Sequence, residues 1–88
     1  MAYRQFSKII KTSIGSREFN FLQRVNQQGF YYNTDVADER GDRLQFDMRL
    51  QDGEWKIAGA LIPEWINKSE KDLHQVITEE QATEPQKM

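Results

Sequence analysis

The sequence predicts an α+β fold, in which a three-stranded antiparallel β-meander packs against N-terminal helices and a C-terminal helix. Two patterns support this prediction. In the first 29 residues the apolar side chains recur every three or four positions, whereas from Phe30 onward they alternate with polar ones. Because these two periods mark one face of a helix and one face of a strand respectively, the chain is expected to change from helix to sheet near Gly29.

The N-terminal part is expected to form two short helices. The apolar positions at helical spacing are Tyr3, Phe6, Ile9 and Ile10 and then, after a break at Ser13–Ser16, Phe19, Leu22 and Val25. Ser16 is a suitable N-cap for the second helix, and Gly29 is a suitable residue after its end. Residues 3–12 stay open between helix and strand, because Ile9 and Ile10 next to Thr12 also suit a strand.

Three strands are expected after Gly29. Leu44–Gln51 alternates apolar and polar residues without exception, and Asp52-Gly53 then favours a two-residue type I′ turn. Such a turn pairs Gln51 with Glu54. The resulting cross-strand pairs are Leu50 with Trp55, Met48 with Ile57, Phe46 with Gly59 and Leu44 with Leu61. Phe30–Ala37 is expected to be the third strand, joined to the central one by the polar loop 38–43.

A helix is expected after the sheet. Pro63 cannot donate to a strand ladder, and Asn67-Lys68-Ser69-Glu70 has the form of a capping box. The apolar stripe of this helix is Leu73, Val76 and Ile77, extended by Ile66. Residues 1–82 are therefore expected to form a single α+β domain, followed by a flexible polar tail at 83–88.

The composition removes most site chemistry. The 88 residues include no cysteine and one histidine, so there is no disulfide framework, thiolate nucleophile or Cys-type zinc site. No P-loop, dinucleotide fingerprint or nucleophile elbow is present. We therefore expect no enzyme, no cofactor and no metal site. With no apolar run long enough for a signal or a membrane span, a cytoplasmic location without membrane contact is expected.

Two acidic features have simple interpretations. The loop Asp38–Asp42, with Asp35 nearby, does not match the spacing of an EF-hand, so it is expected to be a solvated connection between strands. His74 lies four residues after Glu70 on the predicted C-terminal helix. We expect a surface histidine with a carboxylate neighbour on the same helix face.

Charge is divided unevenly along the chain. The formal net charge is −2, but residues 1–29 contribute +4 and residues 30–88 contribute −6. The basic groups of the first part are Arg4, Lys8, Lys11, Arg17 and Arg24. They could bind a phosphate backbone or an acidic partner, or the two parts could neutralise each other within the fold.

Two aromatic residues are candidates for a binding surface. If Phe30 and Tyr32 join the buried face of the sheet, Tyr31 points the other way. Trp65 follows Pro63, where no predicted element obviously buries it. Exposed Tyr and Trp side chains are typical of protein interfaces, although Trp65 could instead fold back over the sheet as part of the core.

Two family resemblances follow from these elements. The order helix, three-stranded meander, helix over residues 16–81, with Phe46–Leu50 as the central strand, is similar to the double-stranded-RNA-binding domain. That resemblance implies RNA binding, but Asn67–Asp72, where the family has its basic cluster, is of mixed charge. The hairpin Asp52–Ile57 resembles the closing strands of NTF2-like domains, which implies a small-ligand pocket.

The function expected from the sequence is a small non-enzymatic protein-interaction or regulatory module. Its partner would bind at the sheet edge and around Tyr31 and Trp65, and self-association as a homodimer is one form of this. The first alternative is nucleic-acid binding through the five basic residues of the N-terminal helices. The second is an NTF2-like small-ligand site.

Overall fold

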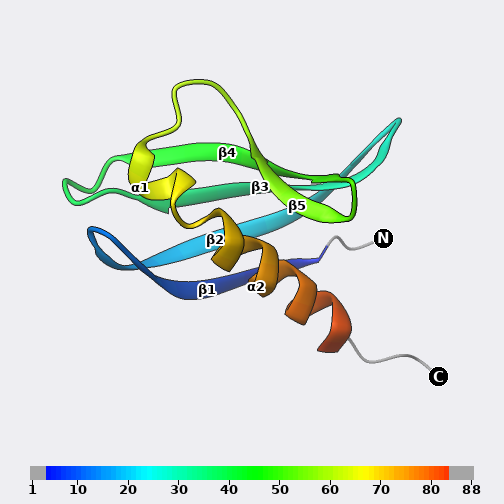
Figure 1. The fold of residues 1–88 in the computed structure, drawn as a ribbon, viewed down its shortest axis with the longest axis horizontal. Coiled ribbons are helices and arrows are strands. Elements are labelled where there is room, and N and C mark those ends of the chain that lie inside the picture. The colour runs from blue at the N-terminus through cyan, green and yellow to red at the C-terminus, as the bar shows by residue number, and fades with distance from the viewer. Residues whose placement is uncertain (1–3, 84–88) are drawn as a thin grey trace.

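The computed structural model describes residues 4–83 and shows a five-stranded antiparallel sheet followed by two helices (Figure 1). The elements are β1 (Gln5–Thr12), β2 (Gly15–Asn26), β3 (Gly29–Ala37), β4 (Arg43–Gln51), β5 (Glu54–Ala58), α1 (Glu64–Asn67) and α2 (Glu70–Thr83). The strands lie side by side in chain order, so the sheet is a meander. Tyr3 of the expected first helix and residues 84–88 of the expected tail lie outside the described residues.

The predicted N-terminal helices are wrong, because that part of the chain forms β1 and β2. The sheet therefore has five strands instead of three, and only the C-terminal side supplies helices. Phe19 and Phe21 are both fully buried on one face, which is the period of a strand. Leu22 lies on the opposite face, and its spacing from Phe19 and Val25 imitates a helix. Residues 5–12 of the segment left open between helix and strand are a strand.

The segment interpreted as a break between helices is a hairpin turn. Thr12 pairs with Gly15, which leaves Ser13 and Ile14 as the two turn residues. The hydroxyl of Thr12 accepts a hydrogen bond from the Ile14 N–H at 3.2 Å and donates one to the Gly15 carbonyl at 2.6 Å. Gly15 has a φ of 109°, which L-residues with a side chain rarely adopt. Local turn chemistry thus joins β1 to β2.

The predicted hairpin after β4 is confirmed as far as Ala58. Gln51 pairs with Glu54 and Leu50 with Trp55, and the positive φ angles of Asp52 and Gly53 are those of a type I′ turn. The expected pairs beyond Ala58 do not form, because β5 ends there. Leu61 is 99% exposed, with a positive φ of 59°, in the loop that leads to α1.

The predicted C-terminal helix is confirmed as α2, but the predicted capping box is not. The Asn67 side chain donates to the Ile62 carbonyl at 3.3 Å instead of capping a helix. The Glu70 carboxylate accepts a hydrogen bond from the Ile57 N–H of β5 at 2.8 Å. Helix α2 therefore begins at Glu70, and its first carboxylate is directed toward the sheet.

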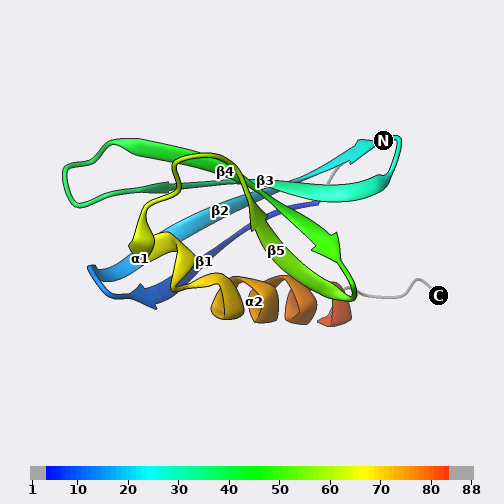
Figure 2. The ribbon, with the colours of Figure 1, turned by 45° about the horizontal axis from the view of Figure 1, so that its top comes forward.

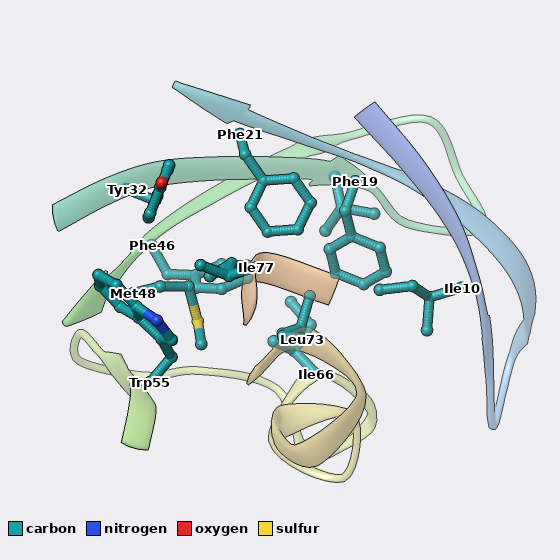
Figure 3. Close-up of a cluster of buried hydrophobic side chains, with 11 residues drawn as sticks. Ile10, Phe19, Phe21, Tyr32, Phe46, Met48, Trp55, Ile66, Leu73 and Ile77 are labelled. Carbon is teal, nitrogen blue, oxygen red and sulfur yellow. The ribbon is translucent and has the colours of Figure 1, made fainter. Parts of the chain in front are cut away.

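The core lies between the curved sheet and the helices, which form two layers (Figure 2). Leu73 and Ile77 of α2 and Ile66 of α1 are fully buried, as the predicted apolar stripe requires. Opposite them the sheet contributes aromatic side chains, among them Phe19, Phe21, Tyr32, Phe46 and Trp55 (Figure 3). We call the face of the sheet that contacts α2 the concave face and the other the convex face.

The convex face is mostly polar, and several of its polar side chains are tied to one another across the strands. Asn20 donates to Asp35 at 2.9 Å, and Asn33 donates to Asp47 at 3.3 Å. Arg43 forms an ion pair with Asp35 at 3.4 Å. Cross-strand polar pairs of this kind stabilise a solvated face without leaving it apolar.

Candidate functional site

The two aromatic residues predicted to bind a partner lie on different parts of the molecule. Tyr31 is on the convex face of β3, half-buried, and the Arg49 guanidinium lies 4.6 Å from the centre of its ring. Trp65 is half-buried in α1, and its ring centre is 6.4 Å from that of Phe19. Trp65 therefore packs on the core, which is the alternative that the sequence left open. The structure does not bring Tyr31 and Trp65 into one site.

The five basic residues predicted as a nucleic-acid site are divided between the two faces. Alternation along β1 and β2 places Arg4, Lys8 and Arg17 on the concave side and Lys11 and Arg24 on the convex side. The Arg4 side chain donates to the Glu80 carbonyl of α2 at 3.0 Å. That of Arg17 donates to the Ile14 carbonyl at 3.4 Å. The helices that were expected to present these cations together are strands.

Two carboxylates in and beside the loop before β4, those of Asp38 and Asp35, have structural partners. One oxygen of Asp38 accepts hydrogen bonds from the backbone N–H groups of Arg40 and Asp42, both at 2.9 Å. Asp35 is paired with Arg43. Among residues 4–83 no group of three or more metal-ligating side chains is placed to hold an ion.

His74 and Glu70 do share one helix face, but that face contacts β5 instead of solvent. The His74 Nδ1 accepts a hydrogen bond from the Trp55 N–H at 3.0 Å, next to the bond from the Ile57 N–H to Glu70. Both N–H groups point out of the free edge of the sheet. The expectation of a simple surface histidine is therefore wrong, because His74 closes an edge of the sheet.

A contiguous apolar row lies uncovered at the end of the concave face. Val25, Phe30 and Leu50 are 54%, 59% and 56% exposed, and we call them the open-end row. Val25 pairs directly with Phe30, and the pairing of Tyr31 with Arg49 places Phe30 beside Leu50. Isolated exposed apolar residues are ordinary, whereas three in a row across neighbouring strands form a patch.

The row is exposed because the helical cover stops before it. The last turns of α2 reach Tyr32, whose hydroxyl accepts a hydrogen bond from Gln81 at 3.3 Å. Phe30 lies two residues farther out on the same face, where the β2–β3 hairpin extends beyond α2 (Figure 1). Between the row and the end of α2 is a hollow of about 670 Å³, to which Phe30, Leu50, Trp55, Thr78 and Gln81 contribute.

A row of three cations and one tyrosine lies on the other face at the same end of the sheet. It consists of Arg24, Tyr31, Arg49 and Lys56, which are successive cross-strand neighbours from β2 to β5, and we call it the cationic row. Arg49 is 3.1 Å from Asp47, and Lys56 is 3.3 Å from Glu54. Arg24 has no ion pair among the described residues. Tyr31 and Arg49 also line the hollow, so the two rows meet at its rim.

The sequence contained a signal for this site that the helical interpretation hid. Val25 and Phe30 flank Gln27 and Gln28, which form the turn between two strands with Gly29 at a φ of 123°. Once Phe19 to Val25 is read as a strand, alternation puts Val25 and Phe30 on the face of the core. The lengths of β2 and β3 then leave both residues beyond the reach of α2.

The comparisons with known proteins give no match: no family model, no curated protein and no solved structure corresponds to this chain. Neither helix within residues 4–83 has the length and apolar content needed to cross a membrane. The features of the molecule that bear on its function are the open-end row, the cationic row and the edges of the sheet.

Proposed function

We propose that this protein is a small non-enzymatic protein-interaction module that binds an apolar segment with acidic flanking residues at the open end of its sheet. The observation that carries the proposal is the open-end row of Val25, Phe30 and Leu50, each more than half exposed, two of which, Phe30 and Leu50, line a hollow. Fully burying one such side chain is worth about 1.5–3 kcal/mol, so a partner that covers the row gains appreciable free energy.

A protein segment suits this surface better than a small molecule does. The hollow has a volume in the range of small-ligand pockets, which supports the NTF2-like alternative. Two of its apolar lining side chains, Phe30 and Leu50, however, face solvent over more than half of their surface, and only Trp55 is buried. A small ligand is usually buried over most of its surface, whereas a peptide can cover an open row of side chains.

The preference for acidic flanks comes from the cationic row. Arg49 lies at the rim of the hollow, and Arg24 and Lys56 continue the positive charge on either side of it. A carboxylate beside the apolar anchor would approach Arg49 and compete with Asp47, which lies 3.1 Å from it. Because the charged side chains of the cationic row are solvated, they are expected to raise the association rate and the selectivity for acidic segments more than the affinity.

Nucleic-acid binding has less support. A phosphate backbone needs several cations on one continuous surface, and the five basic residues of β1 and β2 are shared between two faces. The acidic side chains of the convex face, Asp35 and Asp47, lie between the cationic row and the other end of the sheet.

The test is selection of peptides from a random display library against the wild-type protein. Enriched peptides are expected to contain an aromatic or aliphatic anchor beside Asp or Glu. Each is then titrated against the double variant Phe30→Ser/Leu50→Ser, for which an affinity loss of at least tenfold is expected. The matched control is Leu61→Ser, which removes an equally apolar and more exposed side chain far from the row.

Three outcomes would contradict the proposal. They are the absence of any enriched peptide, equal affinity for the double variant and the wild type, and equal losses for the double variant and Leu61→Ser. Arg49→Glu should also weaken acidic peptides more than Lys71→Glu, which reverses an exposed charge on α2.

A further inference from the structure

The two edge strands of the sheet, β5 and β1, differ in whether their outward backbone N–H groups have acceptors. In β5 the closing pair Gln51–Glu54 directs the N–H groups of Trp55 and Ile57 outward, and side chains of α2 accept both. In β1 the bond from the Gln23 N–H to the Arg4 carbonyl shows that even-numbered residues face β2. The outward N–H and carbonyl groups of β1 are those of Gln5, Ser7, Ile9 and Lys11, and within residues 4–83 these N–H groups have no acceptor.

The free edge is long, and apart from the charges of Lys8 and Lys11 it carries no feature that opposes pairing with another strand. β1 has eight residues, contains no proline and exposes 72% of Ile9 on the convex side. Proteins usually protect such edges with bulges, prolines or covering segments. Side chains of α2 cover the edge of β5, whereas nothing covers the edge of β1 among the described residues. The edge of β1 is therefore available to pair with another strand.

We propose that the strand that pairs with β1 is β1 of a second copy, so that two sheets join across a two-fold axis at Ile9 into one continuous sheet. A two-fold axis perpendicular to the sheet pairs residues of equal parity, and only odd positions have free backbone groups. Centring on Ile9 pairs Ile9 with the partner's Ile9 and Ser7 with the partner's Lys11. About six backbone hydrogen bonds form across this junction.

The charges of β1 disfavour two neighbouring registers. An axis at Lys8 or Lys11 would place two lysines directly opposite each other, which is unfavourable. With the axis at Ile9, each lysine faces an uncharged residue. The exposed Ile9 side chains of the two copies then cover each other on the convex face.

A groove beside β1 provides the complementary charge. It lies between β1 and α2, is lined by Ile10, Val76, Asp72 and Glu79 among others, and has a volume of about 320 Å³. Asp72 and Glu79 are exposed and form no ion pair among the described residues, and Glu79 accepts a hydrogen bond from the Gln75 side chain at 3.0 Å. In the Ile9-centred register the partner's Lys8 lies opposite Ile10 on the concave side, in front of this groove. Each copy thus delivers a cation to the two carboxylates of the other.

Cysteine cross-linking tests this register directly, because the chain has no cysteine of its own. The paired Cα atoms of residue 9 would be about 5.5 Å apart, within the roughly 4.4–6.8 Å that a disulfide spans. Ile9→Cys is expected to form a covalent dimer on mild oxidation. Ser7→Cys alone is not, because its two copies lie about 14 Å apart along the strands. A mixture of Ser7→Cys and Lys11→Cys is expected to cross-link.

The control is Gln45→Cys, an exposed convex residue of β4 away from both edges. Cross-linking of Ile9→Cys no faster than of this control, or equally fast in denaturant, would overturn the proposal. So would a wild-type protein that sediments as a monomer at every concentration.

The effect of a new charge on the dimer dissociation constant distinguishes the register centred on Ile9 from the one centred on Ser7. Ser7→Glu places a carboxylate opposite the partner's Lys11 twice per dimer, so the dissociation constant is expected to fall about two- to tenfold. In a register centred on Ser7 the two new carboxylates would face each other and weaken the dimer. Weakening by Ser7→Glu would therefore overturn the Ile9-centred arrangement. Peptide binding at the open end is measured separately, so its failure leaves this result unaffected.

Discussion

The two edges of the sheet show how one fold can close one strand and leave another available. At β5, His74 and Glu70 accept the outward N–H groups of Trp55 and Ile57, so the helix that covers the core also covers the edge. At β1 the same helix contributes a groove whose carboxylates form no ion pair among the described residues, but no acceptor for the backbone. The difference arises from side-chain placement on α2, since both strands have the same alternation of outward groups.

This comparison explains why residue identity on α2 matters beyond packing. Leu73 and Ile77 fix the helix on the core, and the neighbouring face of the helix is then set against β5. A four-residue spacing between Glu70 and His74 matches the two-residue spacing of Trp55 and Ile57 along the strand, because one helical turn covers about 5.4 Å and two strand residues about 6.8 Å. The closed edge is therefore a consequence of how α2 docks.

The largest effect is expected from proline in β1 and depends on the parity of the position. Ile10→Pro removes an N–H that faces β2 and replaces a buried side chain, so the free energy of unfolding should fall by about 3–4 kcal/mol. Ile9→Pro removes an outward N–H, which edge strands tolerate, and should cost about 1 kcal/mol or less. Urea denaturation of both variants measures the difference.

The two proline variants, Ile9→Pro and Ile10→Pro, also test the proposed dimer. Ile9→Pro is expected to remain folded and to sediment as a monomer, because the central residue of the junction can no longer donate. Equal destabilisation by the two prolines would show that the assignment of inward and outward residues in β1 is wrong.

Opening the closed edge should have the next largest effect. The double variant Glu70→Ala/His74→Ala leaves two part-buried N–H groups of β5 without acceptors, which should lower the free energy of unfolding by about 2 kcal/mol. The exposed β5 should then allow a second mode of association, visible as species larger than a dimer in sedimentation. Lys71→Ala, on the exposed face of the same helix, is the control and should change neither property.

The turn that holds β5 in register should contribute somewhat less. Gly53 has a φ of 83°, and an alanine there is expected to cost about 1–2 kcal/mol. The nearest heavy atoms leave room for a Cβ, so the cost is one of backbone conformation alone. Thermal denaturation of Gly53→Ala tests this, and an unchanged melting temperature would contradict the type I′ assignment.

The smallest effect on the single chain is expected at the exposed centre of β1. Ile9→Thr keeps a β-branched residue at a site that faces solvent, so the free energy of unfolding of the monomer should change by no more than about 0.5 kcal/mol. The dimer, in contrast, should weaken about three- to tenfold in sedimentation equilibrium, because Ile9 packs on its own copy. Unchanged dimerisation would mean that Ile9 lies outside the junction.

The sequence predicted the C-terminal half of the fold because its local signals agree. Alternation over Leu44–Gln51 and the Asp52-Gly53 turn both require one hairpin, and the structure has its register as far as Ala58. The N-terminal half failed because apolar residues lie on both faces of its strands. Ile9 and Leu22 lie on the convex face, where alternation would place polar residues. Together with the apolar residues of the concave face they produce a spacing of three or four residues that resembles a helical stripe.

The candidate sites show the same limit. Alternation correctly placed Tyr31 on the face opposite Tyr32, but it could not show that Arg49 from β4 lies over its ring. The position of Trp65 depended on Phe19, which is far away in the sequence. The closure of β5 by His74 and Glu70 joins segments that only the docking of α2 brings together, so no local pattern predicts it.

The most direct test of the comparison is amide hydrogen exchange measured residue by residue in a dilute and a concentrated sample. We predict slow exchange for Trp55 and Ile57 in both samples. For Ser7, Ile9 and Lys11 we predict fast exchange when dilute and protection that grows with concentration, while Lys8 and Ile10 stay protected throughout. Fast exchange at Trp55 and Ile57, or exchange at Ser7, Ile9 and Lys11 that does not change with concentration, would contradict the account of one closed edge and one edge that pairs with a second copy.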